Sequence, residues 1–112
     1  MKKYQLGEFE EIVLLTVGVL YDNAYGVAIK DEIEKRLKRK VSLGALQSAL
    51  RRMESKGFLE SESGETNLKR GGKPKRFFKM TSFGRRALEY NRDVRADLWK
   101  ALPDMVLEAK FS

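Results

Sequence analysis

The 112-residue sequence contains no cysteine and no histidine. Without cysteine there is no disulfide, no thiolate catalysis and no cysteine-bound metal. Without histidine a zinc or haem site has almost no ligands left, and hydrolases that pair serine with histidine are excluded. We therefore expect neither a metal nor another cofactor.

The sequence also lacks a long apolar run. No stretch of about eighteen apolar residues occurs, which is the length a membrane-spanning helix needs. Residues 1–5 lead into an acidic stretch at residues 8–11 instead of the apolar core of a signal peptide. These features predict a soluble, cytoplasmic protein with no membrane partner.

Positive charge is abundant and confined to one segment. The chain has 23 Lys and Arg against 16 Asp and Glu, a net charge of +7, which favours a polyanionic partner. Residues 65–86 carry this whole excess, because they hold Glu65 as their only acid and these basic residues: Lys69, Arg70, Lys73, Lys75, Arg76, Lys79, Arg85 and Arg86. The basicity is local, as a binding surface requires.

A second, shorter basic run spans residues 35–40. It follows Asp31, Glu32 and Glu34, an order that suits the dipole of a helix ending near residue 39. We therefore interpret this run as a solvated helix end.

Helical periodicity marks the first half of the chain. Residues 8–21 have a wide apolar face, which predicts a helix that packs in the core and against a partner subunit. A second amphipathic helix opens at Tyr25–Gly26 and ends by Lys40. The length of the whole chain allows one compact domain.

A third helix is predicted between Ser42 as its N-cap and Gly57 as its stop. One of its faces is apolar. The opposite face carries small residues first and two arginines later, in the order Gly44, Ala45, Ser48, Arg51, Arg52 and Ser55. Such a face could enter a DNA groove, although a solvated helix surface is the alternative reading.

The second half of the chain predicts a hairpin and a long helix. Residues 58–63 and 76–81 look like short strands joined by a basic, glycine-containing loop. Thr81 or Ser82 caps a long helix that Pro103 ends or kinks, and residues 104–111 are expected to form a last short helix. Leu88 and Trp99 fall outside the main apolar stripe of the long helix, which would leave a tryptophan in water.

Three helices followed by a hairpin and a long helix is the order of a winged helix-turn-helix. The predicted fold is mainly α with a small β-hairpin wing (α+β), with a DNA-binding part at residues 1–81 and a C-terminal dimerisation helix at residues 82–112, forming one compact domain overall. Double-stranded DNA is the expected partner. The expected contacts are Ser42, Gly44, Ala45, Gln47, Ser48, Arg51 and Arg52 on the third helix and Lys69, Arg70, Lys73, Lys75 and Arg76 on the wing.

The sequence resembles the PadR-like family of transcriptional regulators along nearly its whole length. Residues 25–29 resemble the opening of that family's second helix, residues 42–46 its third helix, and residues 71–81 its wing, the most specific match. The resemblance implies a prokaryotic transcriptional regulator, usually a repressor, that binds a dyad-symmetric operator as a homodimer through its C-terminal helix. Gln47 and the pair Phe77–Phe78 stand where the family commonly has tyrosines.

Self-association is also expected from the residues themselves, because the first and last helices carry more apolar surface than one small domain buries. The residues expected at the dimer interface or an effector site are Phe9, Val13, Leu88, Trp99 and Leu102. The resemblance adds a small planar aromatic ligand between the two subunits, with a tryptophan from each chain stacking on it. Packing of Trp99 in the interface is the simpler alternative.

Two other functions compete with DNA binding. A phosphate loop around residues 71–73 fails on spacing, because a P-loop needs Gly and Ser or Thr where the chain has Asn67 and Pro74. We therefore expect no enzyme. A winged helix that binds a protein instead of DNA stays open as the second alternative.

Overall fold

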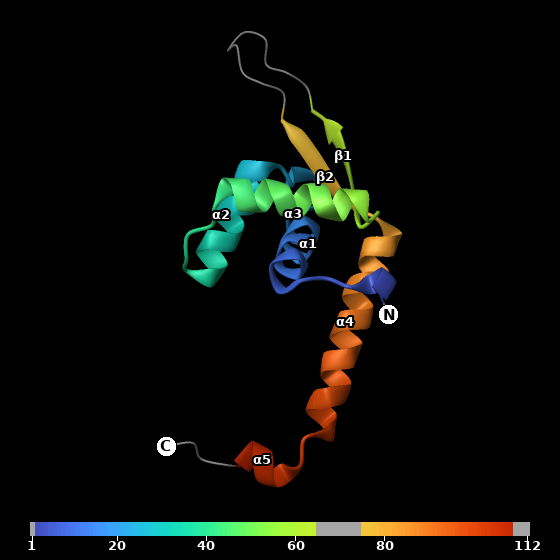
Figure 1. Ribbon diagram of the computed structural model, residues 1–112. Coiled ribbons are helices and arrows are strands. Elements are labelled where there is room, and N and C mark those ends of the chain that lie inside the picture. Colours follow the sequence, from blue (N-terminus) through green and yellow to red (C-terminus); the bar gives the residue numbers. More distant parts are fainter. Residues whose placement is uncertain (1, 65–74, 109–112) are drawn as a thin grey trace.

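The computed structural model describes residues 2–64 and 75–108, and its helices follow the apolar periodicity of the sequence (Figure 1). The elements are η1 (Lys2–Tyr4), α1 (Glu8–Leu20), η2 (Tyr21–Asn23), α2 (Gly26–Leu37), α3 (Leu43–Ser55), β1 (Leu59–Ser63), β2 (Arg76–Met80), α4 (Ser82–Ala101) and α5 (Asp104–Glu108). Every predicted helix and both predicted strands are present, with described ends that differ from the expected ones by at most three residues. The predicted extension of the last helix beyond Glu108 and the tip of the wing lie outside the described residues.

Three helices form the core. The fully buried side chains come from one face of each helix and include Val13, Leu14 and Val17 of α1, Ile29 and Ile33 of α2, and Leu46, Ala49, Leu50 and Met53 of α3. Phe58, Leu59, Phe78 and Ala87 complete this cluster from the hairpin and α4. Because α3 buries only one stripe, its other face is left on the outside of the molecule.

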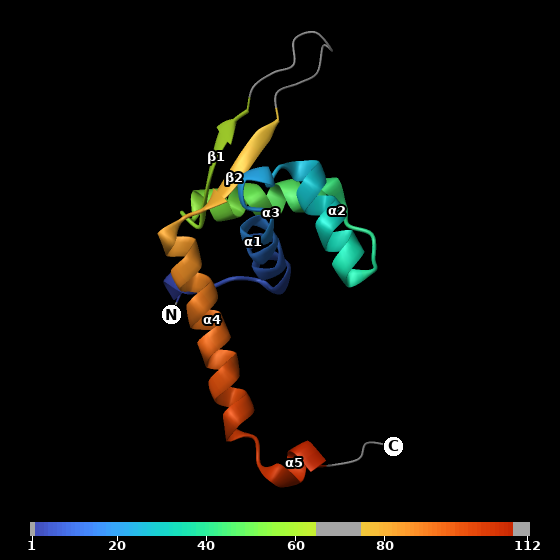
Figure 2. The same ribbon diagram turned by 180° about the vertical axis from the view of Figure 1, so that it is seen from behind.

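The hairpin is antiparallel and joined to the helical core. Leu59 lies opposite Met80 and Ser63 opposite Arg76. The backbone N–H of Phe78 donates to the carbonyl of Ala24 at 2.8 Å, and Tyr25 forms an isolated bridge with Phe77. The base of the wing is therefore tied to the turn before α2, and the strands rise away from the helices (Figure 2).

A close backbone contact fixes the position of the start of α4. Thr81 is its N-cap, with Oγ1 accepting from the N–H of Gly84 at 3.0 Å and donating to the carbonyl of Gly57 at 2.5 Å. Gly84 lies so near the backbone of Phe58 that a Cβ there would overlap it. The hairpin, the end of α3 and α4 therefore meet at one tight joint.

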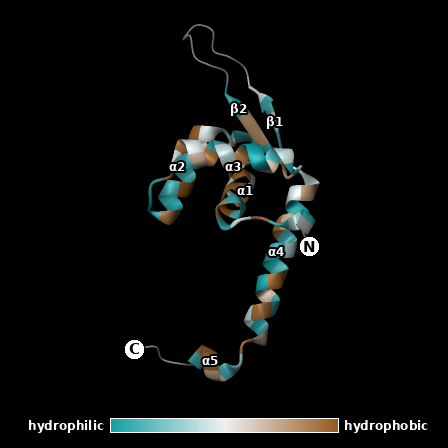
Figure 3. Ribbon diagram, viewed as in Figure 1, coloured by the Kyte–Doolittle hydropathy of each residue, from teal (hydrophilic) through white to brown (hydrophobic). Residues whose placement is uncertain are grey.

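The far part of α4 projects away from the core, which makes the molecule elongated, with extents of 63 × 33 × 21 Å (Figure 1). The N-terminal turn holds the near part: Tyr4 packs against Phe83 and Tyr90, and Asn91 Nδ2 donates to the carbonyl of Tyr4 at 3.0 Å. Beyond that point apolar side chains are exposed, and brown residues recur along the projecting helix (Figure 3).

Candidate nucleic-acid interface

The outer face of α3 is the face that the sequence predicted for DNA. Ser42 caps the helix, since its Oγ accepts from the N–H of Ala45 at 3.2 Å. Side chains of the predicted contact set are exposed here, apart from half-buried Ser48: Ser42, Gly44, Ala45, Gln47, Arg51 and Arg52. Small residues near its N-terminal end allow the helix backbone to approach another surface closely.

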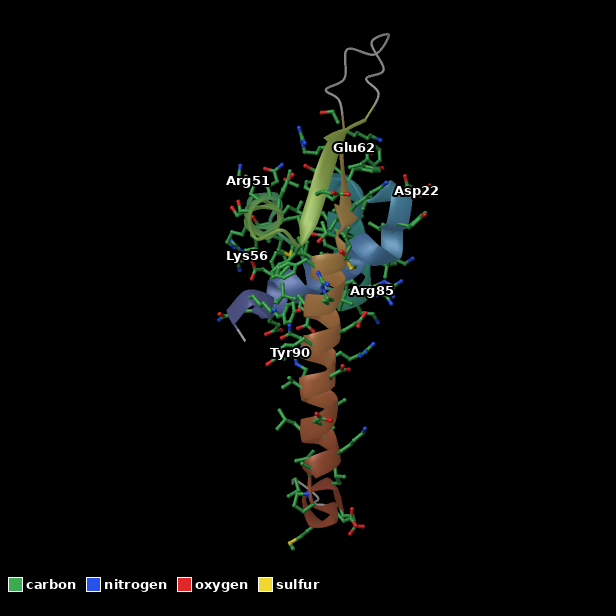
Figure 4. The ribbon with its side chains drawn as sticks, turned by 90° about the vertical axis from the view of Figure 1, so that its right-hand side faces the viewer. Asp22, Arg51, Lys56, Glu62, Arg85 and Tyr90 are labelled. Carbon is green, nitrogen blue, oxygen red and sulfur yellow. The ribbon has the colours of Figure 1, made fainter. Side chains whose placement is uncertain are left out.

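The two arginines of this face differ in their partners. Arg52 Nε lies 3.4 Å from Glu10 Oε2, and Lys56 Nζ lies 3.4 Å from the same oxygen. The side chain of Arg51 makes no hydrogen bond or ion pair with any part of the chain that the structure describes. Arg51 and Lys56 both extend from the outer side of α3, opposite the side where Asp22 lies (Figure 4). Arg51 is therefore the arginine whose guanidinium is available to a ligand.

Glu10 of α1 is the buried acid that pairs with Arg52 and Lys56. Burial by itself raises the pKa of Glu10, but the backbone N–H of Gly7 and the charges of Lys56 and Arg52 outweigh burial and lower that pKa below its ordinary value. Glu10 Oε1 also accepts from Gly7 N–H at 2.8 Å, which caps the start of α1. Sequence reasoning missed Glu10 because its partners lie more than forty positions away in the chain.

A groove of about 700 Å³ runs between α3, the start of α2 and the base of the wing. It brings together four predicted contacts, Gln47, Arg51, Lys75 and Arg76, and adds Tyr25 and Val27. The remaining predicted wing residues, Lys69, Arg70 and Lys73, lie outside the described residues. The groove therefore joins the third helix to the wing as one surface.

Contacts in and beside this groove hold the wing cations in place. Lys75 Nζ lies 4.2 Å from the centroid of the Tyr25 ring, a cation–π distance. Arg76 Nη1 donates to Ser61 Oγ at 3.0 Å, and Ser61 donates to Glu54 Oε2 at 2.7 Å. Tyr25, which the sequence marked only as a helix opening, thus also positions a wing lysine.

A second groove of about 720 Å³ lies between α1, β2 and α4. Leu15, Met80, Leu88, Ala96 and Trp99 supply its apolar side chains. Charged residues surround them, and Arg95 Nη1 bridges α4 to both carboxylate oxygens of Glu11 at 2.6 and 2.7 Å. The structure thus places Leu88 and Trp99 on one surface, and the ring of Trp99 is 66% exposed.

The other expected interface residues have different positions. Phe9 and Leu102 are half-buried. Val13 is 0% exposed inside the core of the same protomer, so its expected contact with a partner is wrong. Leu15 of α1, by contrast, is 49% exposed.

Among residues 2–64 and 75–108, no helix is both long and apolar enough to cross a membrane. Over the same residues, no three acidic side chains gather closely enough to hold a metal ion. Neither observation adds a site to the two grooves.

Comparison with known proteins identifies relatives over most of the chain. Residues 14–90 match the family described as the transcriptional regulator PadR-like family. A PadR-like transcription factor from Bacteroides fragilis is 25% identical, with a TM-score of 0.71 over 89% of this chain and 88% of its own. A PadR family regulator from Eggerthella lenta is also 25% identical, with a TM-score of 0.68 over 92% and 88%.

More distant likeness concerns the fold alone. The ORC1 protein of Aeropyrum pernix, solved in complex with DNA, is 17% identical, with a TM-score of 0.62 over 85% of this chain and 27% of its own. No curated protein matches the chain.

Proposed function

Since the chain belongs to the PadR-like family of transcriptional regulators, we propose that it is a sequence-specific DNA-binding repressor acting as a homodimer on a dyad-symmetric operator. The observation that carries this proposal is the continuous groove from the outer face of α3 to the wing base. Gln47, Arg51, Lys75 and Arg76 meet there on an exposed surface.

The two parts of this surface have different roles. Arg51 and Gln47 can reach base edges in a major groove, because arginine binds guanine bidentately and glutamine binds adenine in the same way. Lys75 and Arg76 belong to the wing, whose cations meet the phosphate backbone. In this proposal α3 sets sequence specificity and the wing sets affinity.

Homodimer formation is supported by the apolar surface of α4. Val94, Leu98 and Trp99 are 42%, 64% and 66% exposed within one protomer. A second copy related by a two-fold axis would bury these side chains and would place two α3 helices on successive turns of DNA.

An effector is proposed for the groove that contains Trp99. A small planar aromatic compound would stack on this indole in the dimer. The compound would lower operator affinity only if it binds the DNA-free state of the protein more tightly than the DNA-bound state. Quenching of Trp99 fluorescence by planar compounds at micromolar concentration, with a parallel loss of operator binding, is the expected result. If Trp99→Ala only produces monomers, or if no compound of a broad planar panel quenches the fluorescence, the effector proposal fails.

The DNA-binding proposal is tested by selecting genomic fragments with purified protein and then titrating the selected duplex and a random duplex at several salt concentrations. We expect tighter binding to the selected duplex and a loss of binding to both as salt rises. A protein that retains no duplex at low salt would instead be a protein-binding winged helix.

A further inference from the structure

The basic run at residues 35–40 contains several cations whose side chains have no partner within the described residues, and only its Arg36 is paired with an acid. The side chains of Lys35, Lys38 and Arg39 make no hydrogen bond or ion pair within the described residues. Lys40 also lacks a close partner, and its charge acts only at a distance on Glu34. By contrast, Arg52, Lys56 and Arg95 are each bound to an acid.

Two of the acids that precede this run are engaged within α2, and of the run itself they pair only with Arg36. Glu32 pairs with Arg36 at 2.6 Å, and Glu34 pairs with Lys30 at 3.1 Å, both within α2. The helix dipole accounts for cations in the last turn of α2, such as Lys35 and Arg36. It does not account for Lys38, Arg39 and Lys40, which follow the last helical residue, Leu37. The interpretation of the run as only a helix end therefore leaves three charges unexplained.

These three residues lie on a loop that is fixed at both ends. At the α2 end, the N–H of Lys38 donates to the carbonyl of Glu34 at 2.8 Å, and at the α3 end the N–H of Val41 donates to Glu34 Oε2 at 2.7 Å. The hydrogen bond from Val41, followed by that from Lys30, lowers the pKa of the Glu34 carboxyl. Val41 is buried at 8% exposure, whereas Lys38, Arg39 and Lys40 are exposed. The cations are thus presented on an ordered support.

Lys38 also occupies a backbone conformation that disfavours lysine. Its φ of 54° and ψ of 40° lie in the left-handed region, where a helix end usually has glycine or asparagine. A lysine at this position is less stable than glycine would be, so fold stability does not explain its presence.

The loop leads directly into the helix that the proposed function places in the major groove. Lys40 is two residues before Ser42, the N-cap of α3, so its Cα lies within about 7 Å of that of Ser42. A helix about 10–12 Å across fills a major groove about 12 Å wide. The chain that leads into such a helix must therefore pass the sugar-phosphate backbone at the rim of the groove.

We propose that Lys38, Arg39 and Lys40 form a second phosphate-binding site, which contacts the DNA backbone where the chain enters α3. The chain enters α3 through this loop and leaves it toward the wing (Figure 1), so in this proposal the loop and the wing bind the backbone at two separate places beside the recognition helix. This inference rests on the proposed DNA-binding function.

The test compares variants that remove the same charge from two places. Arg39→Gln/Lys40→Gln and the control Lys3→Gln/Lys100→Gln each lower the net charge by two. Binding to a random-sequence duplex is measured between about 50 and 200 mM salt, the range over which phosphate contacts change affinity strongly. We expect the loop variant to reduce the slope of log K against log salt by about two units and the control to keep the wild-type slope.

Further variants separate the possible causes. Arg39→Lys/Lys40→Arg should keep the wild-type slope, and Lys38→Asn, which tolerates the left-handed conformation, should reduce it by about one unit. Should the double loop variant unfold in a thermal melt, Arg39→Gln alone is measured and is expected to lose about one unit.

Three results would overturn the inference. The first is an unchanged salt slope in the loop variants, and the second is an equal loss of slope in the control. The third is that the loop variants lose binding to anionic vesicles while their DNA binding stays intact. If the wild-type protein binds no duplex at low salt, the proposed function fails first, and that result is distinct from all three.

Discussion

At the scale of single residues, partners matter more than residue type. Arg51 and Arg52 are neighbours in the sequence and both exposed, yet Arg52 lies beside the buried acid Glu10 and Arg51 does not. Glu10 also binds Lys56 and caps α1. A single carboxylate on the first helix thus decides which cations of α3 are available.

Replacement of Arg51 by Ala should narrow the difference in binding free energy between operator and random DNA by about 1–3 kcal/mol, because a bidentate base contact is lost. Arg52→Ala should leave that difference closer to the wild-type value, since its guanidinium is held by Glu10. Fluorescence anisotropy with both duplexes measures this, with Lys100→Ala as the remote control. Equal losses on the two duplexes for Arg51→Ala would show that Arg51 contacts phosphate and not bases.

Glu10→Gln should lower the free energy of unfolding at neutral pH by about 1–2 kcal/mol, because Arg52 and Lys56 lose their shared acid while glutamine can keep the hydrogen bond from Gly7. The folded-state pKa of Glu10 is lowered from the ordinary 4.5, so its stabilising effect is complete above that value. It is lost as the pH falls through the lower folded-state pKa.

The difference in stability between wild type and Glu10→Gln should therefore be constant near pH 7 and should shrink on acidification below 4.5. Urea denaturation at a series of pH values gives this difference. A difference in stability that stays constant down to pH 3 would contradict the role assigned to the charge of Glu10.

At the scale of secondary-structure elements, the joint between the hairpin and α4 is tightly constrained. Thr81 binds both Gly57 and Gly84, and Gly84 leaves no room for a side chain against Phe58. The direction in which α4 leaves the core is determined at these residues.

Gly84→Ala should lower the free energy of unfolding by about 2 kcal/mol or more, because a methyl group would overlap the backbone of Phe58. Gly26→Ala provides the matched control, since nothing lies within 4 Å of a Cβ at that position in α2. Thermal and urea denaturation of both variants test the prediction. Equal stability of the two variants would mean that α4 can shift away from Phe58 at little cost.

The elements could be predicted from the sequence because their signals are local. The apolar stripe of α3, the cap at Ser42 and the turn residues around the hairpin all act within a few positions. The candidate site could be predicted only in part. Three features depend on how the elements pack together: the pairing of Arg52 with Glu10, the ring contact of Lys75 with Tyr25 and the burial of Val13. The periodicity of a single helix carries no information about that packing.

At the scale of the whole molecule, the protein divides into a packed core and a projecting helix. Leu98 and Trp99 lie in the last turn of α4 and are mostly exposed. A substitution there should change association and leave the fold of the core intact.

Trp99→Ala should weaken the dimer by about 2 kcal/mol or more, because buried tryptophans contribute strongly at interface centres. Sedimentation over a range of concentrations measures the change, and Lys100→Ala, one residue further along, is the control. The melting temperature of the core should stay close to that of the wild type. Wild-type protein that sediments as a monomer at micromolar concentration would rule out the dimer on which this prediction depends.

In the proposed dimer, the long helix α4 would act as a lever. Its 20 residues span about 30 Å, so a rotation of about 10° at the Thr81 joint moves its far end by about 5 Å. In a dimer held together at the far ends of two such levers, small angular changes at the joints become large changes in the distance between the two α3 helices. A compound wedged between α1 and α4 near Trp99 would therefore alter the spacing of the half-sites that the protein can bind, without touching either recognition surface.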